Sequence, residues 1–117
     1  GIDEVAAKSR QTEPSMRQDV ERKELAFQIQ TLGGIGRHFH IHNGEITSMA
    51  GLIGNPQFTM TFRDAAKGFA ILSAKDSKEA FLAALHDEDL RLSGDFVEVM
   101  WFQGLTEYLK PASVPQH

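Results

Sequence analysis

Three histidines alternate with apolar residues in the stretch RHFHIHNGE, and an acidic residue follows them. In an extended strand, side chains two residues apart project from one face, so His38, His40 and His42 would share a face. Two imidazoles at this spacing can bind one zinc ion, and Glu45 could supply an oxygen ligand. The three histidines together would spread over roughly 13 Å, which is too far for one ion. A small metalloenzyme built on this row is one hypothesis, and a polar strand face is the other.

The dipeptide Asn43-Gly44 indicates how this row is placed, because it is a strong signal for a two-residue hairpin turn. Such a turn pairs His42 with Glu45 and Ile41 with Ile46. Apolar residues then fall on one face and the histidines on the other, and the alternation in neighbouring segments continues this division. We therefore predict that the histidines mark the solvent-facing side of an antiparallel sheet, and we assign no metal site.

The spacing of apolar residues changes along the chain between the two-residue period of strands and the longer period of helices. Asp64 and the sequence Asp76-Ser77-Lys78-Glu79 are typical of helix starts. The predicted helices cover 16–23, 65–73, 77–86 and 96–109, and the predicted strands cover 25–30, 37–42, 45–50, 57–63 and 90–93. This order predicts the α+β class, with a five-stranded, mainly antiparallel sheet and helices packed on one of its faces.

Composition limits the classes of protein to which the chain can belong. With 117 residues, 41% of them apolar, it can form one domain with a substantial core. A formal net charge of −4 argues against a nucleic-acid partner, and no apolar run reaches the roughly 18 residues of a membrane span. The absence of cysteine excludes disulfides and is compatible with a reducing compartment, so we expect a cytoplasmic location. Residues 1–13 are predicted to be a polar tail or linker, 14–111 the domain, and 112–117 a disordered tail.

The sequence offers little support for catalysis. No serine lies in a nucleophile elbow, and no cysteine is present to act as a nucleophile. Gly33-Gly34-Ile35-Gly36 joins two strands and lacks the Lys-Ser/Thr of a phosphate loop. Asp87-Glu88-Asp89 could gather a cation, but a solvated helix end is the preferred interpretation. We therefore expect neither an enzyme nor a bound cofactor.

From the second strand to the last helix, the sequence resembles the sterol carrier protein type 2 family. The segments that carry the resemblance are FHIHNGEI, NPQFTMTF, the helix opened by Asp64, the helix containing KEAF, the strand and turn LRLSGD, and the helix over 96–109. Together with a looser match upstream, they cover roughly residues 16–110. The helix before the last strand is longer than is usual in the family and ends in an acidic link, which could reshape one wall of the ligand site.

The resemblance implies a hydrophobic tunnel between the sheet and the helices, and a ligand such as a sterol, fatty acid, acyl-CoA or isoprenoid. The implied function is non-catalytic carriage or presentation of that lipid. Residues at core-facing spacings are candidates to line the tunnel, although ordinary core packing would give the same spacings. The candidates are Phe39, Phe58, Met60, Phe62, Phe69, Leu72, Phe81, Leu85, Val97, Met100, Trp101, Leu105 and Tyr108, with Phe27 and Ile29 as further floor residues.

The last helix leaves an alternative open, because it is apolar nearly all round. Such a helix can be buried on both sides, line a cavity or meet a partner. The alternative is an accessory or dimerisation module of a larger enzyme or complex, with no open tunnel. A homodimer, an upstream domain and transient membrane contact are all compatible with the sequence. The chain ends in Pro-Gln-His, which is not a peroxisomal address.

Overall fold

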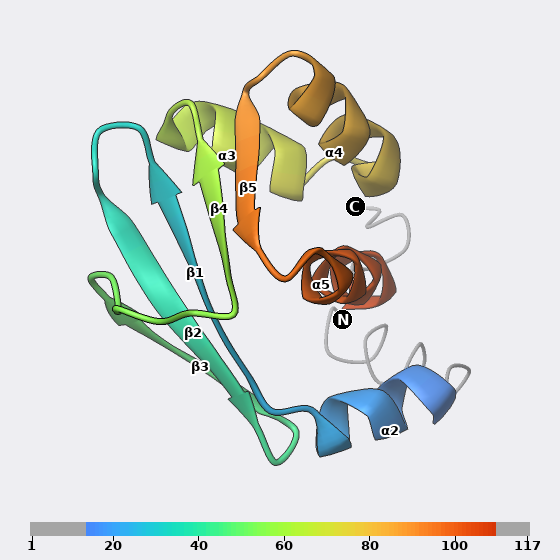
Figure 1. Cartoon of the computed structure of the whole chain (residues 1–117). Coiled ribbons are helices and arrows are strands. Elements are labelled where there is room, and N and C mark those ends of the chain that lie inside the picture. Colours follow the sequence, from blue (N-terminus) through green and yellow to red (C-terminus); the bar gives the residue numbers. More distant parts are fainter. Residues whose placement is uncertain (1–13, 110–117) are drawn as a thin grey trace, which may run out of the picture.

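The computed structural model describes residues 14–109, so the predicted tails at 1–13 and 112–117 lie outside the described residues. Within this range the elements follow the predicted order, and no boundary differs from its predicted position by more than two residues. The elements, labelled in Figure 1, are α2 (Pro14–Arg22), β1 (Leu25–Thr31), β2 (Gly36–His42), β3 (Glu45–Ala50), β4 (Phe58–Phe62), α3 (Ala65–Leu72), α4 (Ser77–His86), β5 (Leu90–Gly94) and α5 (Phe96–Leu109).

The five strands form one sheet in the order β3-β2-β1-β4-β5. Three of the four strand pairs are antiparallel, whereas β1 and β4 are parallel. This parallel pair arises because the chain leaves β3 at the sheet edge and crosses β2 and β1 before it enters β4 (Figure 1). Helices α3, α4 and α5 all lie on one face of the sheet. The predicted α+β fold, with a mainly antiparallel five-stranded sheet, is confirmed.

The hairpin between β2 and β3 has the predicted register. Asn43 and Gly44 both have positive φ, of 52° and 81°, as a two-residue hairpin turn requires. His42 pairs with Glu45, and Ile41 pairs with Ile46. The histidines therefore lie on the face of the sheet that is turned away from the helices.

The segment 51–57, which links β3 to β4, covers part of that outer face (Figure 1). The Ile53 amide donates to Gln28 Oε1 at 2.8 Å, and His38 Nδ1 lies 3.0 Å from the Gly51 carbonyl oxygen. Gln28 is only 8% exposed as a result. The prediction of a polar face that is open to solvent over its whole width is therefore wrong at β1, where the crossing segment satisfies the buried amide.

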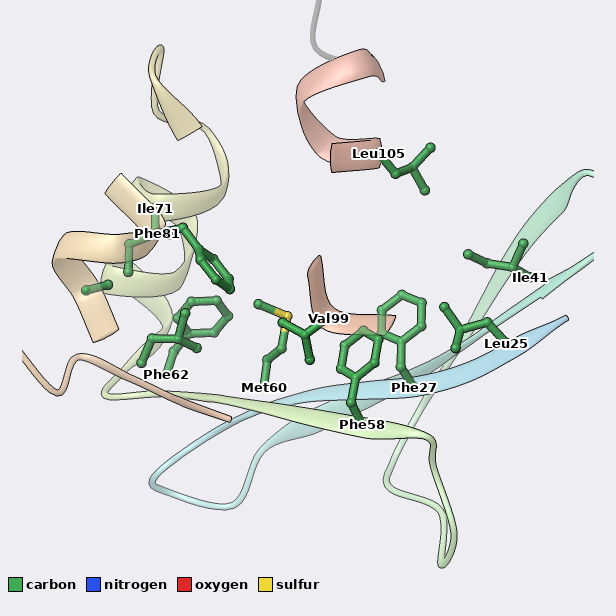
Figure 2. Packing of buried hydrophobic residues seen from close by; sticks show 12 residues of the cluster. Leu25, Phe27, Ile41, Phe58, Met60, Phe62, Ile71, Phe81, Val99 and Leu105 are labelled. Atoms are coloured by element: carbon green, nitrogen blue, oxygen red, sulfur yellow. The ribbon is translucent and has the colours of Figure 1, made fainter. Parts of the chain in front are cut away.

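Phenylalanine rings form the centre of the core on the inner face of the sheet (Figure 2). The ring of Phe27 stacks on Phe39 and on Phe58, with ring centroids 5.0 and 4.8 Å apart. The ring of Phe102, which belongs to α5, packs against Phe27 as well. Such pairs contribute roughly 0.5–1.5 kcal/mol beyond the area that they bury. The alternation of apolar residues along β1, β2 and β4 brings these rings together, because these strands are neighbours in the sheet.

The acidic run at 87–89 is not simply a solvated helix end, as the sequence suggested. Asp89 Oδ1 accepts a hydrogen bond from Arg63 Nε at 2.6 Å, and Lys67 Nζ lies 3.7 Å from its other oxygen. The Arg63 hydrogen bond and the two positive charges lower the pKa of Asp89, while partial burial opposes them. The run therefore joins the end of β4 and the start of α3 to the turn before β5. Asp87 and Glu88 are exposed, as expected.

Candidate lipid-binding site

An open apolar groove lies between the ends of β1 and β2 and the helix α3. Its volume is about 300 Å³. This volume is at the lower end of the range of about 300–1,000 Å³ that is common for small-molecule pockets. The apolar side chains that line the groove are Ile29, Ile35, Phe39, Phe62, Phe69 and Leu72. In Figure 1, helices α3 and α4 lie beside β4 and β5, whereas every residue of the edge strand β3 is exposed.

Two glycines beside the groove allow close packing, one on each face of the sheet. A Cβ at Gly68 on α3 would lie 3.1 Å from the ring of Phe62, so glycine allows the helix to approach the sheet closely. A Cβ at Gly36 would lie 2.5 Å from a methyl carbon of Leu52 and 2.8 Å from the Ile29 carbonyl oxygen, so glycine there lets the segment after β3 approach the outer face of the sheet. A side chain at Gly68 would push α3 away from the groove.

The mouth of the groove carries two large apolar side chains that face solvent. Ile35, in the turn between β1 and β2, is 78% exposed, and Phe69, on α3, is 76% exposed. Exposed apolar side chains are common when they are scattered, but these two line the same open groove. Together they extend the apolar surface of the groove outwards to bulk water.

Two charged side chains line the groove. Asp64 is the N-cap of α3, because its Oδ1 accepts a hydrogen bond from the Lys67 amide at 2.8 Å. Arg37 lies on β2 opposite Ile29, and its Nη2 donates to Ser48 Oγ on β3 at 3.2 Å. The site thus has an apolar floor and a cation on the side that faces β3.

A second, much smaller space lies between the sheet and α5. It is lined by Met60, Phe81 and Phe102 among others and holds about 10 Å³. That is about enough for the centre of one water molecule and far too little for a lipid chain. Of these two spaces, the groove beside α3 is the one with room for a lipid chain.

The predicted ligand-lining residues fall into three groups. Phe39, Phe62, Phe69 and Leu72 line the groove. Another set packs in or against the core: Phe58, Met60, Phe81, Leu85, Met100, Trp101 and Leu105. Val97 is 75% exposed on the outside of α5, and the side chain of Tyr108 lies outside the described part of the chain.

Sequence reasoning named Ile29 as a floor residue but missed Ile35, Arg37 and Gly68. Ile35 lies in a glycine-rich turn, and the periodicity of strands and helices does not predict which way a turn residue points. Arg37 could have been found, because it lies two residues before Phe39 in the same alternating strand and therefore shares its face.

The histidine row has no metal-binding geometry in the described part of the chain. No group of three or more His, Asp or Glu side chains there is close enough to hold an ion. The rings of His38 and His40 are 5.6 Å apart, edge to face. His42 Nδ1 instead lies 2.6 Å from Glu24 Oε2, a residue just before β1 that the sequence did not suggest as a partner.

Comparison with known proteins identifies the fold. No family model matches the chain, and no curated protein matches it in sequence. Solved structures do match it. One is described as "UbiJ-SCP2 Ubiquinone synthesis protein", with a TM-score of 0.65 and 14% identity over 93% of this chain and 88% of that one. Another is palmitated SCP2L2 from Aedes aegypti, with a TM-score of 0.53 and 17% identity over 83% of this chain and 92% of that one.

A segment of a larger enzyme also has this fold. The stereoselective inverting sec-alkylsulfatase Pisa1 from Pseudomonas sp. matches with a TM-score of 0.61 and 15% identity, over 76% of this chain but 14% of the enzyme. At these identities the similarity shows the fold alone. The resemblance to sterol carrier protein 2 that the sequence suggested is confirmed at that level.

Proposed function

Because the chain has the fold of sterol carrier protein 2 domains, we propose that it is a non-catalytic domain that binds a lipid chain in the groove beside α3. The observation that carries this proposal is the groove itself, about 300 Å³ of open space walled by Phe39, Phe62, Phe69 and Leu72. A solved neighbour of the same fold is described as palmitated. The ligand would be carried or presented by the domain and not transformed.

The energetics favour an aliphatic ligand. Each methylene group that leaves water for an apolar site contributes about 0.8 kcal/mol. A chain in the groove would also cover the exposed side chains of Ile35 and Phe69, which adds to the apolar area removed from water. Because the groove is small for a ligand site, a single acyl or isoprenoid chain is a better fit than a bulky sterol.

The residues around the groove support a non-catalytic role. No serine, cysteine, histidine or lysine is among the side chains that line it. Its carboxylate, Asp64, is held by the helix cap. A nucleophile paired with a base, as covalent catalysis requires, is therefore lacking among the lining residues that the structure describes. In this same described range, no helix has the length and apolar character to cross a membrane.

A blocking substitution tests the proposed site. Ala65 and Ala66 are adjacent, exposed residues of α3, but only Ala65 lines the groove. We expect the Ala65→Trp variant to lose binding of a fluorescent fatty acid. The Ala66→Trp variant should bind the same fatty acid as tightly as the unmodified protein. Mass spectrometry of lipids extracted from the purified proteins should show the same contrast. If both variants bind alike, or if the unmodified protein binds no lipid, the proposal is wrong.

A second candidate function is an accessory module of a larger enzyme or complex. The match to a segment of the Pseudomonas sulfatase favours it, since that segment is a small part of an enzyme. Strand β3 also lies at the sheet edge with all six of its residues exposed, which leaves a strand open to pairing. A stable homodimer in light scattering, lost on Ile46→Pro but unaffected by Ala65→Trp, would favour this function over lipid binding, because the Ile46 amide faces the open edge of β3.

A further inference from the structure

We propose that Asn43 is a site of deamidation, at which the chain converts its own side-chain amide into a carboxylate with help from His42 and Glu24. Asn43 lies in the hairpin turn between β2 and β3, and none of these three residues lines the groove beside α3. The proposal is therefore independent of lipid binding. It begins with the bond between Asn43 and Gly44, because the backbone nitrogen of Gly44 is the nucleophile.

The Gly44 nitrogen is well suited to attack the Asn43 side chain. In a two-residue turn, the hydrogen bonds are exchanged by the flanking pair, His42 and Glu45, so the Gly44 amide takes no part in the ladder. Glycine has no Cβ to obstruct closure of a ring between its nitrogen and the preceding side chain. Asn43 and Gly44 are also both exposed, so water reaches the turn.

The imidazole of His42 lies between a carboxylate and the amide that would leave. Its Nδ1 lies 2.6 Å from Glu24 Oε2, and its Nε2 lies 3.0 Å from Asn43 Nδ2. A carboxylate can only accept a hydrogen bond and an amide NH₂ can only donate one. Both contacts therefore require the same neutral tautomer, with the proton on Nδ1 and the lone pair on Nε2. Glu24 thus orients a base whose lone pair points at the side-chain amide of Asn43.

The reaction needs no oxidant and no cofactor. His42 Nε2 takes the Gly44 amide proton while the Gly44 nitrogen forms a bond to Asn43 Cγ. The imidazole then gives this proton to Asn43 Nδ2, the bond from Cγ to Nδ2 breaks, and ammonia leaves. The succinimide ring that remains is opened by water at either of its carbonyl carbons. The products are aspartate and isoaspartate, so the net reaction is the hydrolysis of one amide.

The products would change the end of the β2–β3 hairpin. The new carboxylate adds negative charge to a corner that already holds Glu24 and Glu45, and a Cβ at Gly44 would lie 3.5 Å from Glu21 Cγ. Like charges across a strand pair are destabilising. Isoaspartate also lengthens the main chain of the turn, which fixes the register of β3. Deamidation would therefore act as a slow switch that loosens the edge strand.

Peptide mapping by mass spectrometry tests the proposal on the purified full chain, incubated at neutral pH. The sequence supplies an internal control, because the other asparagine, Asn55, precedes Pro56. The proline nitrogen carries no hydrogen and cannot form the succinimide. We expect aspartate and isoaspartate to accumulate at Asn43 and not at Asn55. An Asn43 that stays intact as long as Asn55 would overturn the proposal.

Variants locate the base. His42→Gln should slow deamidation by at least about tenfold, since general acid–base catalysis typically contributes 10²–10⁴-fold. His40→Gln is the matched control, because His40 lies two residues earlier on the same face and should leave the rate unchanged. Glu24→Gln should also slow the reaction, and Glu24→Asp should restore part of the rate, which loss of packing alone would not explain. Urea denaturation shows that each variant is folded under the incubation conditions. Equal rates in His42→Gln and His40→Gln, or a Glu24→Gln rate equal to that of the unmodified protein, would contradict the proposal.

Discussion

Gly68 of α3 packs directly on the ring of Phe62, and a Cβ at this position would lie 3.1 Å from two of the ring carbons. A larger side chain there must displace the ring, which is 2% exposed and cannot move without disturbing the core. We expect Gly68→Val to lower the free energy of unfolding by about 1–3 kcal/mol, the usual cost of overpacking. Urea denaturation measures this directly.

Gly104 provides the matched control for that substitution. It lies inside α5, and a Cβ there would meet no atom within 4 Å. Gly104→Ala should therefore raise the free energy of unfolding by about 0.5–1 kcal/mol, because alanine is the better helix former. A Gly68→Val protein that is as stable as the original would show that α3 is not held against β4.

The exposed ring of Phe69 should contribute to ligand binding and not to stability. Phe69→Ser removes an apolar side chain that is 76% exposed, so the unfolding transition should change little. If the ring covers the ligand, affinity for a lipid chain should fall by roughly five- to tenfold, part of the 1.5–3 kcal/mol that complete burial of such a side chain contributes. Val97→Ser is the control, because Val97 is 75% exposed but lies away from the groove.

These two variants also separate the predicted ligand-lining residues. The sequence named both Phe69 and Val97, but the groove contains only the first. Equal loss of affinity in both variants would place the ligand on α5 and contradict the site beside α3. A displacement assay with one fluorescent probe is sufficient for the comparison.

Lys23 connects the start of β1 to the final helix. Its Nζ lies 2.5 Å from Glu98 Oε1 and 4.6 Å from the ring centre of Trp101. That oxygen is buried and has no hydrogen-bond donor in suitable geometry, so the ion pair alone compensates its charge. Lys23→Gln should destabilise the protein by about 1–3 kcal/mol, since the largely buried Glu98 carboxylate would lose its positively charged partner. Lys23→Gln with Glu98→Gln should recover part of the loss.

Trp101 reports on this contact spectroscopically, because it is the only tryptophan of the chain. The emission maximum should shift to longer wavelength in Lys23→Gln if α5 loosens from β1. An additive loss of stability in the double variant would mean that the two charges do not interact.

Asp89 should make stability depend on pH. Its pKa is lower in the folded protein than the ordinary value of 3.8, because Arg63 donates a hydrogen bond to it and Lys67 lies nearby. A carboxyl group with a lowered pKa contributes stability fully above pH 3.8 and loses that contribution as the pH falls through the folded-state value. Asp89→Asn should therefore lower the urea midpoint at pH 7, and the difference should shrink below pH 3.8. A constant difference across this range would contradict the ion pair.

Much of the fold could be predicted because local signals agreed. Alternation in β1, β2 and β4 marked the inner face correctly, and Asn43-Gly44 fixed the register of the hairpin. Asp64 and Asp76 mark the starts of their helices, where each side chain accepts an amide hydrogen bond. These features depend on residues that are close together in the sequence.

The remaining features depend on packing between segments that are far apart in the sequence. The spacing of apolar residues does not reveal such packing. The burial of Gln28 follows from the path of the segment after β3, and the Arg63–Asp89 pair joins residues 26 positions apart. The groove beside α3 could not be located from the sequence either. Apolar spacing identifies the residues that face inwards, but it does not show whether their volumes fill the space beneath α5.

The position of a bound fatty acid tests the central claim most directly. Intermolecular nuclear Overhauser effects between acyl-chain protons and assigned side chains of the protein would locate the ligand. We predict contacts to Ile35, Phe62 and Leu72 beside α3. Contacts instead to Val99 and Leu105 beneath α5, or no contacts under conditions that saturate a functional site, would contradict the account.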